Sequence, residues 1–237
     1  MLILGASSEV GCQLIEHTST QYTKIIAHYN QTKDRLTNLS KNSTAEFCLE
    51  QADFSNRAST DYFLECLKKY NEITDIVHCP AVYPINERFH KMDPDRFAIS
   101  YQVQFQSIVQ ILRLCLPAMV KAKKGRIIFL LTSYTEAIPP AYLADYVSMK
   151  YALLGLMKAL SSEYSAKGLC INAVSPSMME TRFLKNIPSV VVEEMRMNSP
   201  RKQLVSVLDA VNAMKFLLSD HANAITGQNI FITGGSH

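Results

Sequence analysis

The chain has 237 residues, of which 48% are hydrophobic, and its formal net charge is +3. This length and apolar content fit one large domain with a sizeable buried core better than two small domains. The one tight basic cluster, residues 121–126, lacks interleaved aromatic side chains, which argues against a nucleic-acid-binding surface.

The composition also argues against a secreted or membrane protein. Six cysteines are scattered along the chain without a Cys-x-x-Cys pair, so we expect reduced thiols in a cytoplasmic protein. The first apolar run is short and has no basic leader, and no run of about eighteen apolar residues suggests a membrane span. The spacing of His28, His78 and His90 predicts no metal site.

Short apolar runs alternate with longer mixed stretches along the chain. We expect strands at residues 2–4, 24–28, 46–49, 73–77, 126–131, 169–174 and 229–233. We expect helices at residues 10–17, 33–41, 59–70, 95–122, 142–167 and 209–218. This alternation favours an α/β fold: one parallel sheet, covered by helices on both faces and joined by right-handed crossovers. No internal repeat or linker divides the chain, so residues 1–237 are expected to form a single domain.

Residues 178–205 form the least periodic part of the chain. They place apolar side chains among polar residues, with Pro188 and Pro200 between them. So long an irregular segment in a compact domain is often functional, and we expect a mobile, apolar-lined lid over a substrate. The alternative is an amphipathic helix that packs on the core.

The stretch "LGASSEVG" follows the first predicted strand and opens the first predicted helix. Gly5 permits a sharp turn, Ser7 and Ser8 offer hydroxyls, and Gly11 allows the helix to pack close to the sheet. Backbone N–H groups and the helix dipole make such a turn an anion site. Glu9 opposes this, because two unit charges about 4 Å apart repel by about 4 kcal/mol at an effective dielectric of 20. In a first helical turn, however, the carboxylate can point to solvent, and we expect it to swing outward.

A second motif carries the chemistry. Tyr146 follows Ser133 by thirteen positions, and Lys150 follows Tyr146 by four. On a helix Tyr146 and Lys150 share one face. A nearby ammonium can lower the phenol pKa from its usual value near 10, so that Tyr146 exchanges a proton with a substrate oxygen. Ser133, at a strand end, could hold that oxygen and stabilise its developing charge.

The pattern Ser-x12-Tyr-x3-Lys, with "LGASSEVG" upstream and "INAVSPSMMET" and "ITGQNIFITGG" downstream, resembles the classical short-chain dehydrogenase/reductase family. The resemblance runs from Leu4 to Gly235 and is nearest to members like 3-oxoacyl-carrier-protein reductase. It implies a Rossmann-type, doubly wound sheet of about seven strands and a nicotinamide cofactor. The implied activity is the interconversion of a carbonyl group and a secondary alcohol by hydride transfer.

The resemblance also assigns roles to individual residues. It makes Ser133, Tyr146 and Lys150 catalytic, with Lys150 also holding the nicotinamide ribose, and it places Gln104 where the family has an active-site Asn. Asp53 matches a residue that contacts adenine, and residues 176–181 match a segment that meets the nicotinamide. The full set of expected cofactor-binding residues is Gly5, Ser7, Ser8, Glu9, Val10, Gly11, Tyr29, Asn30, Lys33, Asp53, Phe54, Cys79, Pro80, Ala81, Tyr146, Lys150, Pro176, Met179 and Thr181.

Four departures from the family pattern stand out. Glu9 replaces the middle glycine of the first turn, and His78-Cys79-Pro80-Ala81 replaces the usual Asn-Asn-Ala-Gly. Gln104 has the amide of the family Asn on a longer stem, and Ser177 replaces a common glycine. These departures keep an alternative open: a divergent member with weakened cofactor binding that acts as a binding or regulatory protein.

The end of the second predicted strand bears on the choice of cofactor. Residues 27–33 contain no acid, whereas Asn30, Thr32 and Lys33 could accept a 2′-phosphate. We therefore expect NADP, with NAD possible as the alternative. The expected partners are a small carbonyl or alcohol substrate, free or carrier-bound, and further copies of the chain in a homodimer or homotetramer that pairs helices 95–122 and 142–167. No nucleic-acid or membrane partner is expected.

Overall fold

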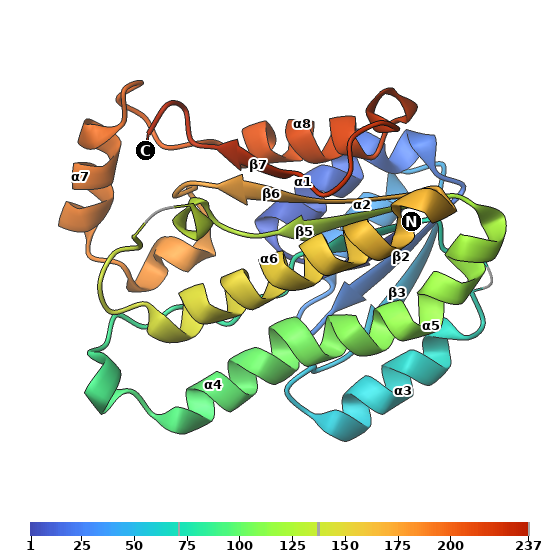
Figure 1. Cartoon of the computed structure of the whole chain (residues 1–237), viewed down its shortest axis with the longest axis horizontal. Coiled ribbons are helices and arrows are strands. Elements are labelled where there is room, and N and C mark those ends of the chain that lie inside the picture. The colour runs from blue at the N-terminus through green and yellow to red at the C-terminus, as the bar shows by residue number, and fades with distance from the viewer. Residues whose placement is uncertain (71, 137, 237) are drawn as a thin grey trace.

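The computed structural model of the protein describes residues 1–70, 72–136 and 138–236. Its centre is a seven-stranded parallel sheet with the strand order β3-β2-β1-β4-β5-β6-β7 (Figure 1). The order reverses between β1 and β4, the switch point at which α/β sheets bind ligands. The strands are β1 (Leu2–Leu4), β2 (Lys24–Tyr29), β3 (Glu46–Gln51), β4 (Asp75–His78), β5 (Gly125–Leu130), β6 (Leu169–Pro176) and β7 (Asn229–Ile232).

Helices cover both faces of the sheet and separate two apolar cores (Figure 1). Because side chains alternate along a strand, Ile3 packs in one core while Leu2 and Leu4 pack in the other. The first core is covered by α1 (Glu9–Thr18), α2 (Asp34–Lys41) and α8 (Val207–Leu217); the second is covered by α3 (Arg57–Leu67), α5 (Ser107–Ala122) and α6 (Ala144–Tyr164). The expected single α/β sheet with helices on both faces is confirmed.

The long helix expected at residues 95–122 is interrupted. It consists of α4 (Pro94–Ser100), a π-helical turn (Tyr101–Gln106) and α5. By length and a mean hydropathy of 1.4, the stretch Pro94–Ala122 could cross a membrane. Its apolar face, with Ile108 and Leu112, is instead buried in the second core, as in the core helix of a globular domain.

The 178–205 segment is more regular than expected. It contains a 3-10 turn, η6 (Arg182–Asn186), and a helix, α7 (Ser189–Asn198). None of the residues of α7 is buried, so the alternative of a helix packed on the core is not what the structure shows. The segment leaves and rejoins the body at one place, where Met179 forms a β-bridge with Val205.

All six cysteines are free, and Cys12, Cys79 and Cys115 are buried. This agrees with the expected reduced thiols.

Candidate active site

A cavity of about 380 Å³ opens at the carboxyl ends of the central strands. Its walls come from residues 8–10 after β1, residues 130–132 after β5 and residues 176–179 after β6. The 178–205 segment adds apolar side chains, among them Phe183, Leu184 and Met195. The cavity therefore lies at the switch point of the sheet, between its strand ends and the segment expected to form a lid.

The turn after β1 depends on its two glycines. Gly5 has a φ of +71°, and its N–H donates to Nδ1 of His28 at 3.0 Å. A Cβ on Gly11 would lie 2.6 Å from the carbonyl oxygen of Ala6, so only glycine fits. The hydroxyl of Ser8 donates to the carbonyl of Gly5 and accepts from the N–H of Gly11, which caps α1. This hydroxyl thus holds the turn together.

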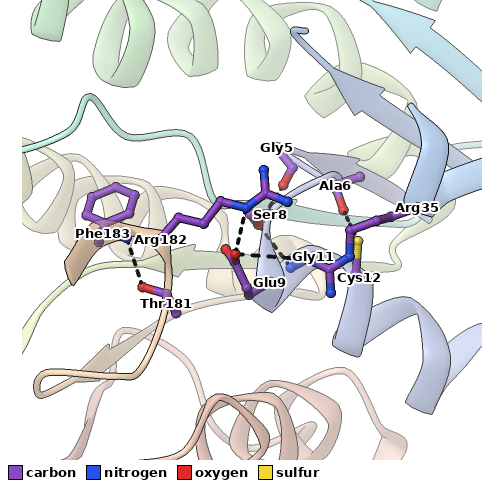
Figure 2. A network of polar contacts seen from close by, with 10 residues as sticks. All are labelled: Gly5, Ala6, Ser8, Glu9, Gly11, Cys12, Arg35, Thr181, Arg182 and Phe183. Atoms are coloured by element: carbon purple, nitrogen blue, oxygen red, sulfur yellow. Dashed lines mark hydrogen bonds and ion pairs between the residues drawn. The ribbon is translucent and has the colours of Figure 1, made fainter. Parts of the chain in front are cut away.

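Glu9 does not point to open solvent, which corrects the expectation. Its side chain is 24% exposed and lines the cavity. The carboxylate lies 3.1 Å from Nε of Arg182 and 4.0 Å from Nη1 of Arg35 (Figure 2). The sequence motif gave no signal for either arginine, because both lie outside the turn and one of them lies far along the chain.

Tyr146 and Lys150 both line the cavity from α6. Nζ of Lys150 lies 5.6 Å from the centre of the Tyr146 ring and donates to the carbonyl oxygen of Leu130 at 2.9 Å. The lysine is only 2% exposed. The shared helical face inferred from the four-residue spacing is thus what the structure shows.

The pKa of Tyr146 differs from the expected value. Burial raises the pKa of Tyr146 to about 12, and a side-chain hydrogen bond with Thr132 opposes this rise. Burial lowers the pKa of Lys150 to about 8. The expected lowering of the phenol pKa by Lys150 is therefore absent from this structure. At neutral pH the phenol carries its proton, which is the state that a proton donor to a carbonyl oxygen needs.

Thr132, and not Ser133, is among the residues that line the cavity. β5 ends at Leu130, and Thr132 lines the cavity beside Tyr146, whereas Ser133 lies outside the lining and begins a 3-10 turn. The carbonyl of Ser133 accepts the N–H of Glu136 in that turn. The motif locates the hydroxyl by its distance from Tyr146, which gives Ser133. The end of β5 at Leu130 is a second reference point, and the residues that directly follow it, Leu131 and Thr132, line the cavity.

Gln104 and His78 are completely buried and lie outside the lining of the cavity. Gln104 belongs to the π-helical turn and His78 ends β4. Both nitrogens of the His78 ring and both polar atoms of the Gln104 amide lack a hydrogen-bond partner within the described part of the chain. Burial lowers the pKa of His78 well below its usual value, so this imidazole is neutral.

A network not foreseen from the sequence holds the start of α6. Oδ1 of Asp145 accepts the N–H of Tyr146 at 2.8 Å. Oδ2 of Asp145 pairs with Nη2 of Arg96 at 2.8 Å, and Arg96 also donates to the carbonyl oxygen of Tyr83 at 3.1 Å. The side chain of Asp145 is 2% exposed. This buried pair fixes the backbone from which the Tyr146 side chain projects.

The expected cofactor-binding residues divide into those that line the cavity and those that do not. The residues that line the cavity are Ser8, Glu9, Val10, Cys79, Ala81, Tyr146, Lys150, Pro176, Met179 and Thr181. Those outside its lining are Gly5, Ser7, Gly11, Tyr29, Asn30, Lys33, Asp53, Phe54 and Pro80. Two residues of the second group have partners within the chain: the carboxylate of Asp53 accepts from the N–H and hydroxyl of Ser55, and Phe54 stacks on His28 with ring centres 4.1 Å apart.

Comparison with known proteins identifies the family of the chain. A family model described as enoyl-(acyl carrier protein) reductase matches residues 5–237. The 3-oxoacyl-[acyl-carrier-protein] reductase of Staphylococcus epidermidis is 24% identical over 240 residues, covering 100% of this chain and 98% of the relative.

Two solved structures share the fold. A 3-oxoacyl (acyl-carrier-protein) reductase from Agrobacterium tumefaciens with NADP bound has a TM-score of 0.88 at 21% identity, covering 99% of this chain and 92% of that chain. A 3-oxoacyl-[acyl-carrier protein] reductase from Brucella melitensis with bound NAD has a TM-score of 0.86 at 20% identity, covering 99% and 89%. Because the family match spans nearly the whole sequence, this chain belongs to the short-chain dehydrogenase/reductase family and is an oxidoreductase similar to the 3-oxoacyl-[acyl-carrier-protein] reductases.

Proposed function

We propose that this protein interconverts a carbonyl group and a secondary alcohol with NADP(H), and that Tyr146 is the general acid and base. One observation carries the proposal: Thr132, Tyr146 and Lys150 meet in one cavity at the carboxyl edge of the sheet. A hydroxyl, a protonated phenol and a buried ammonium are the groups that a carbonyl reduction needs.

The residues around the cavity fit a dinucleotide. At Gly5 an added Cβ would lie 3.2 Å from the backbone nitrogen of Pro80, so the glycine keeps the turn open and close to the strand end after β4. α1 begins at Glu9, and its first residues line the same cavity. The first turn of a helix favours an anion, because its N–H groups have no partners within the helix. Arg182 and Arg35 already surround an anion there, the carboxylate of Glu9. The donor set therefore suits a diphosphate, on condition that this carboxylate moves.

Each chain residue has a distinct part in the proposed reaction. When bound, the nicotinamide supplies the hydride to the carbonyl carbon. Tyr146 gives its proton to the carbonyl oxygen, and the hydroxyl of Thr132 donates a hydrogen bond to that oxygen while charge develops on it. The ammonium of Lys150 stabilises the phenolate that remains, and the carbonyl of Leu130 fixes the orientation of the lysine. In the oxidising direction the same phenolate accepts the proton back.

The preference for NADP rests on the end of β2. No acid lies between Ala27 and Lys33, and both Asn30 and Lys33 are exposed. A carboxylate in this region would repel a 2′-phosphate, whereas Lys33 attracts one.

The substrate is proposed to be a 3-oxoacyl thioester, free or carrier-bound. The wall formed by Phe183, Leu184, Ile187, Val191 and Met195 is apolar and suits an acyl chain. The similarity to the reductases of Staphylococcus epidermidis and Agrobacterium tumefaciens supports the same substrate class, because both are 3-oxoacyl-[acyl-carrier-protein] reductases by name.

The chain is further proposed to work as a homodimer or homotetramer in the cytoplasm. An apolar groove between α5 and α6 offers a surface for a second copy. The free cysteines fit a reducing compartment.

Turnover of a 3-oxoacyl thioester with NADPH and with NADH tests the proposal. Wild type should oxidise NADPH faster than NADH. Tyr146→Phe should abolish turnover and leave the affinity for NADPH largely intact, because it removes only the proton donor. Lys150→Ala should impair both turnover and NADPH affinity.

The position of Glu9 favours one second candidate, a protein of the family that has lost tight cofactor binding and acts as a binding or regulatory protein. Spectroscopic titration separates the two. A change in nicotinamide fluorescence on mixing supports the enzyme, and no change with either nucleotide supports the second candidate.

A further inference from the structure

The turn after β1 carries a cluster of charges that takes no part in the proposed proton and hydride transfers. Glu9 begins α1, and its carboxylate pairs with Arg182 and faces Arg35 (Figure 2). Arg182 belongs to the 178–205 segment and Arg35 belongs to α2. The carboxylate therefore joins three parts of the chain that are far apart in sequence. Glu9 itself lines the cavity, and Arg182 lies between two residues that line it, Thr181 and Phe183.

The carboxylate occupies a place suited to any anion. The N–H groups of a first helical turn have no partners within the helix, and the helix dipole adds positive charge. In the proposed function, the diphosphate of the cofactor would lie at this turn. A diphosphate and the Glu9 carboxylate would repel each other there and compete for the guanidinium of Arg182.

We propose that Glu9 is an internal competitor of the cofactor diphosphate, and that Arg182 exchanges the carboxylate for the diphosphate when the dinucleotide binds. The identity of the anion rests on the proposed function. With no nucleotide bound, the Glu9–Arg182 pair holds the 178–205 segment against the start of α1. With nucleotide bound, Arg182 holds the same segment against the cofactor. The exchange thus links cofactor affinity to the position of the segment over the cavity.

Removal of the Glu9 charge should therefore have two separate effects. Glu9→Gln removes the repulsion and frees Arg182, so the Kd for NADPH should fall roughly tenfold. In protein without nucleotide, the same variant loses the ion pair, so the backbone amides of residues 178–199 should exchange hydrogen faster. Arg182→Met should raise the Kd for NADPH, because the diphosphate loses a cation and still meets the carboxylate.

Glu193→Gln is the matched control. Glu193 lies in α7 of the same segment, and its partner is Arg196 in an exposed pair with an N–O distance of 3.2 Å. The control removes the same charge from the same part of the molecule but leaves the turn after β1 untouched. Its Kd for NADPH should stay within about twofold of wild type, since an exposed pair contributes little.

The experiment combines NADPH titration by nicotinamide fluorescence with hydrogen exchange of nucleotide-free protein, for wild type and the three variants. Tighter binding and faster exchange in Glu9→Gln, with neither change in Glu193→Gln, is the expected result. Nucleotide binding that Glu9→Gln does not strengthen, or exchange that it does not accelerate, overturns the inference and leaves the proposed function standing. Failure of wild type and Glu9→Gln alike to bind either nicotinamide nucleotide overturns both.

Discussion

Among single residues, Thr132 and Ser133 differ in their position relative to the cavity. Ser133 has the spacing to Tyr146 that the family motif requires, yet the strand ends so that Thr132 lines the cavity. The two residues are adjacent and both carry a hydroxyl, so they form a natural pair of test and control.

Thr132→Ala should lower kcat for carbonyl reduction by roughly a hundredfold, because one hydrogen bond to the developing oxyanion is lost. Ser133→Ala should leave kcat within about threefold of wild type, because Ser133 is partly exposed and lies outside the cavity lining, where substitutions have small effects. Steady-state kinetics of both variants checks this. A large loss in Ser133→Ala with a small loss in Thr132→Ala would return the role to Ser133.

His28 is a second residue whose role the sequence did not reveal. Its ring is 3% exposed, accepts from the N–H of Gly5 and contacts the carbonyl oxygen of Ala52 at 3.0 Å. Since Nδ1 accepts, Nε2 carries the proton, and the ring is neutral. It joins the turn after β1 to the residue that follows β3, and burial lowers its pKa from 6.5 to about 4.

This shift predicts a pH dependence of stability. Between pH 6.5 and about 4 the unfolded chain binds a proton at this imidazole that the folded protein does not bind. The free energy of unfolding should therefore fall as the pH falls through that window, by about 3 kcal/mol for this group. Urea unfolding at several pH values measures the loss. His28→Gln should be less stable at neutral pH but should lose less stability on acidification. An equal loss in both proteins would contradict the assignment.

Residue identity alone predicted part of the site. Tyr146 and Lys150 could be placed together because helical spacing fixes which side chains share a face. The contacts of Glu9 could not be predicted, because its partners Arg35 and Arg182 belong to separate elements. No local sequence pattern predicts how these elements pack against each other. The pKa of Tyr146 depends on the depth of burial, which the motif does not encode.

Among the elements, the seven strands were predicted from apolar runs bounded by polar stretches. These runs indicate strands because helices cover both faces of the sheet, so that the side chains on both faces of a strand are buried. The interruption of the helix at residues 101–106 was missed, since a π-helical turn keeps nearly the same apolar pattern as an α-helix. A helix in the 178–205 segment was expected only as the alternative, and packed on the core. Helix α7 instead turns Val191 and Met195 to the cavity, and none of its residues is buried.

The Arg96–Asp145 pair ties α4 to the first turn of α6. Asp145→Asn keeps an oxygen for the N–H of Tyr146 but leaves Arg96 without its counter-charge. Loss of one partner of a buried pair should cost about 3 kcal/mol of unfolding free energy. It should also lower kcat more than it changes the Kd for NADPH, because the Tyr146 backbone loses its fixed position.

The exposed pair of Arg57 and Asp61 in α3 gives the control. Asp61→Asn should change stability by less than about 1 kcal/mol and leave kcat unchanged. Thermal unfolding and kinetics of both variants supply the comparison. Equal behaviour of the two would show that the Arg96–Asp145 pair has no positioning role.

At the scale of the whole molecule, the surface formed by α5 and α6 is apolar. Its groove is lined by Val109, Leu116, Leu156 and Leu160, among others. Gly155 lies within α6, and apart from its chain neighbours and the adjacent backbone of its own helix, no atom of the described residues lies within 4 Å of a Cβ added there. Glycine inside a helix lowers stability, and the close approach of a second copy at this point would explain why Gly155 is a glycine.

Leu160→Glu should therefore convert the proposed homo-oligomer to monomers, because it places a charge in an apolar contact. Leu208→Glu on α8 is the control, since Leu208 is 39% exposed on the opposite face of the sheet. Light scattering after size-exclusion chromatography measures the mass of each. A wild-type monomer, or a Leu160→Glu variant that keeps its mass, would contradict the proposed contact.

In the proposed reaction, a hydride and the proton of Tyr146 reach the two ends of one carbonyl bond in this cavity. Mass analysis of the product tests this, after a 3-oxoacyl thioester has been mixed with NADPH in which deuterium replaces both hydrogens of the reactive ring carbon. We predict a 3-hydroxyacyl thioester with one deuterium on the former carbonyl carbon for wild type, and no such product for a Tyr146→Phe variant that still binds NADPH. A deuterated product at the wild-type rate from Tyr146→Phe, or deuterium at another position of the product, would contradict the proposed reaction.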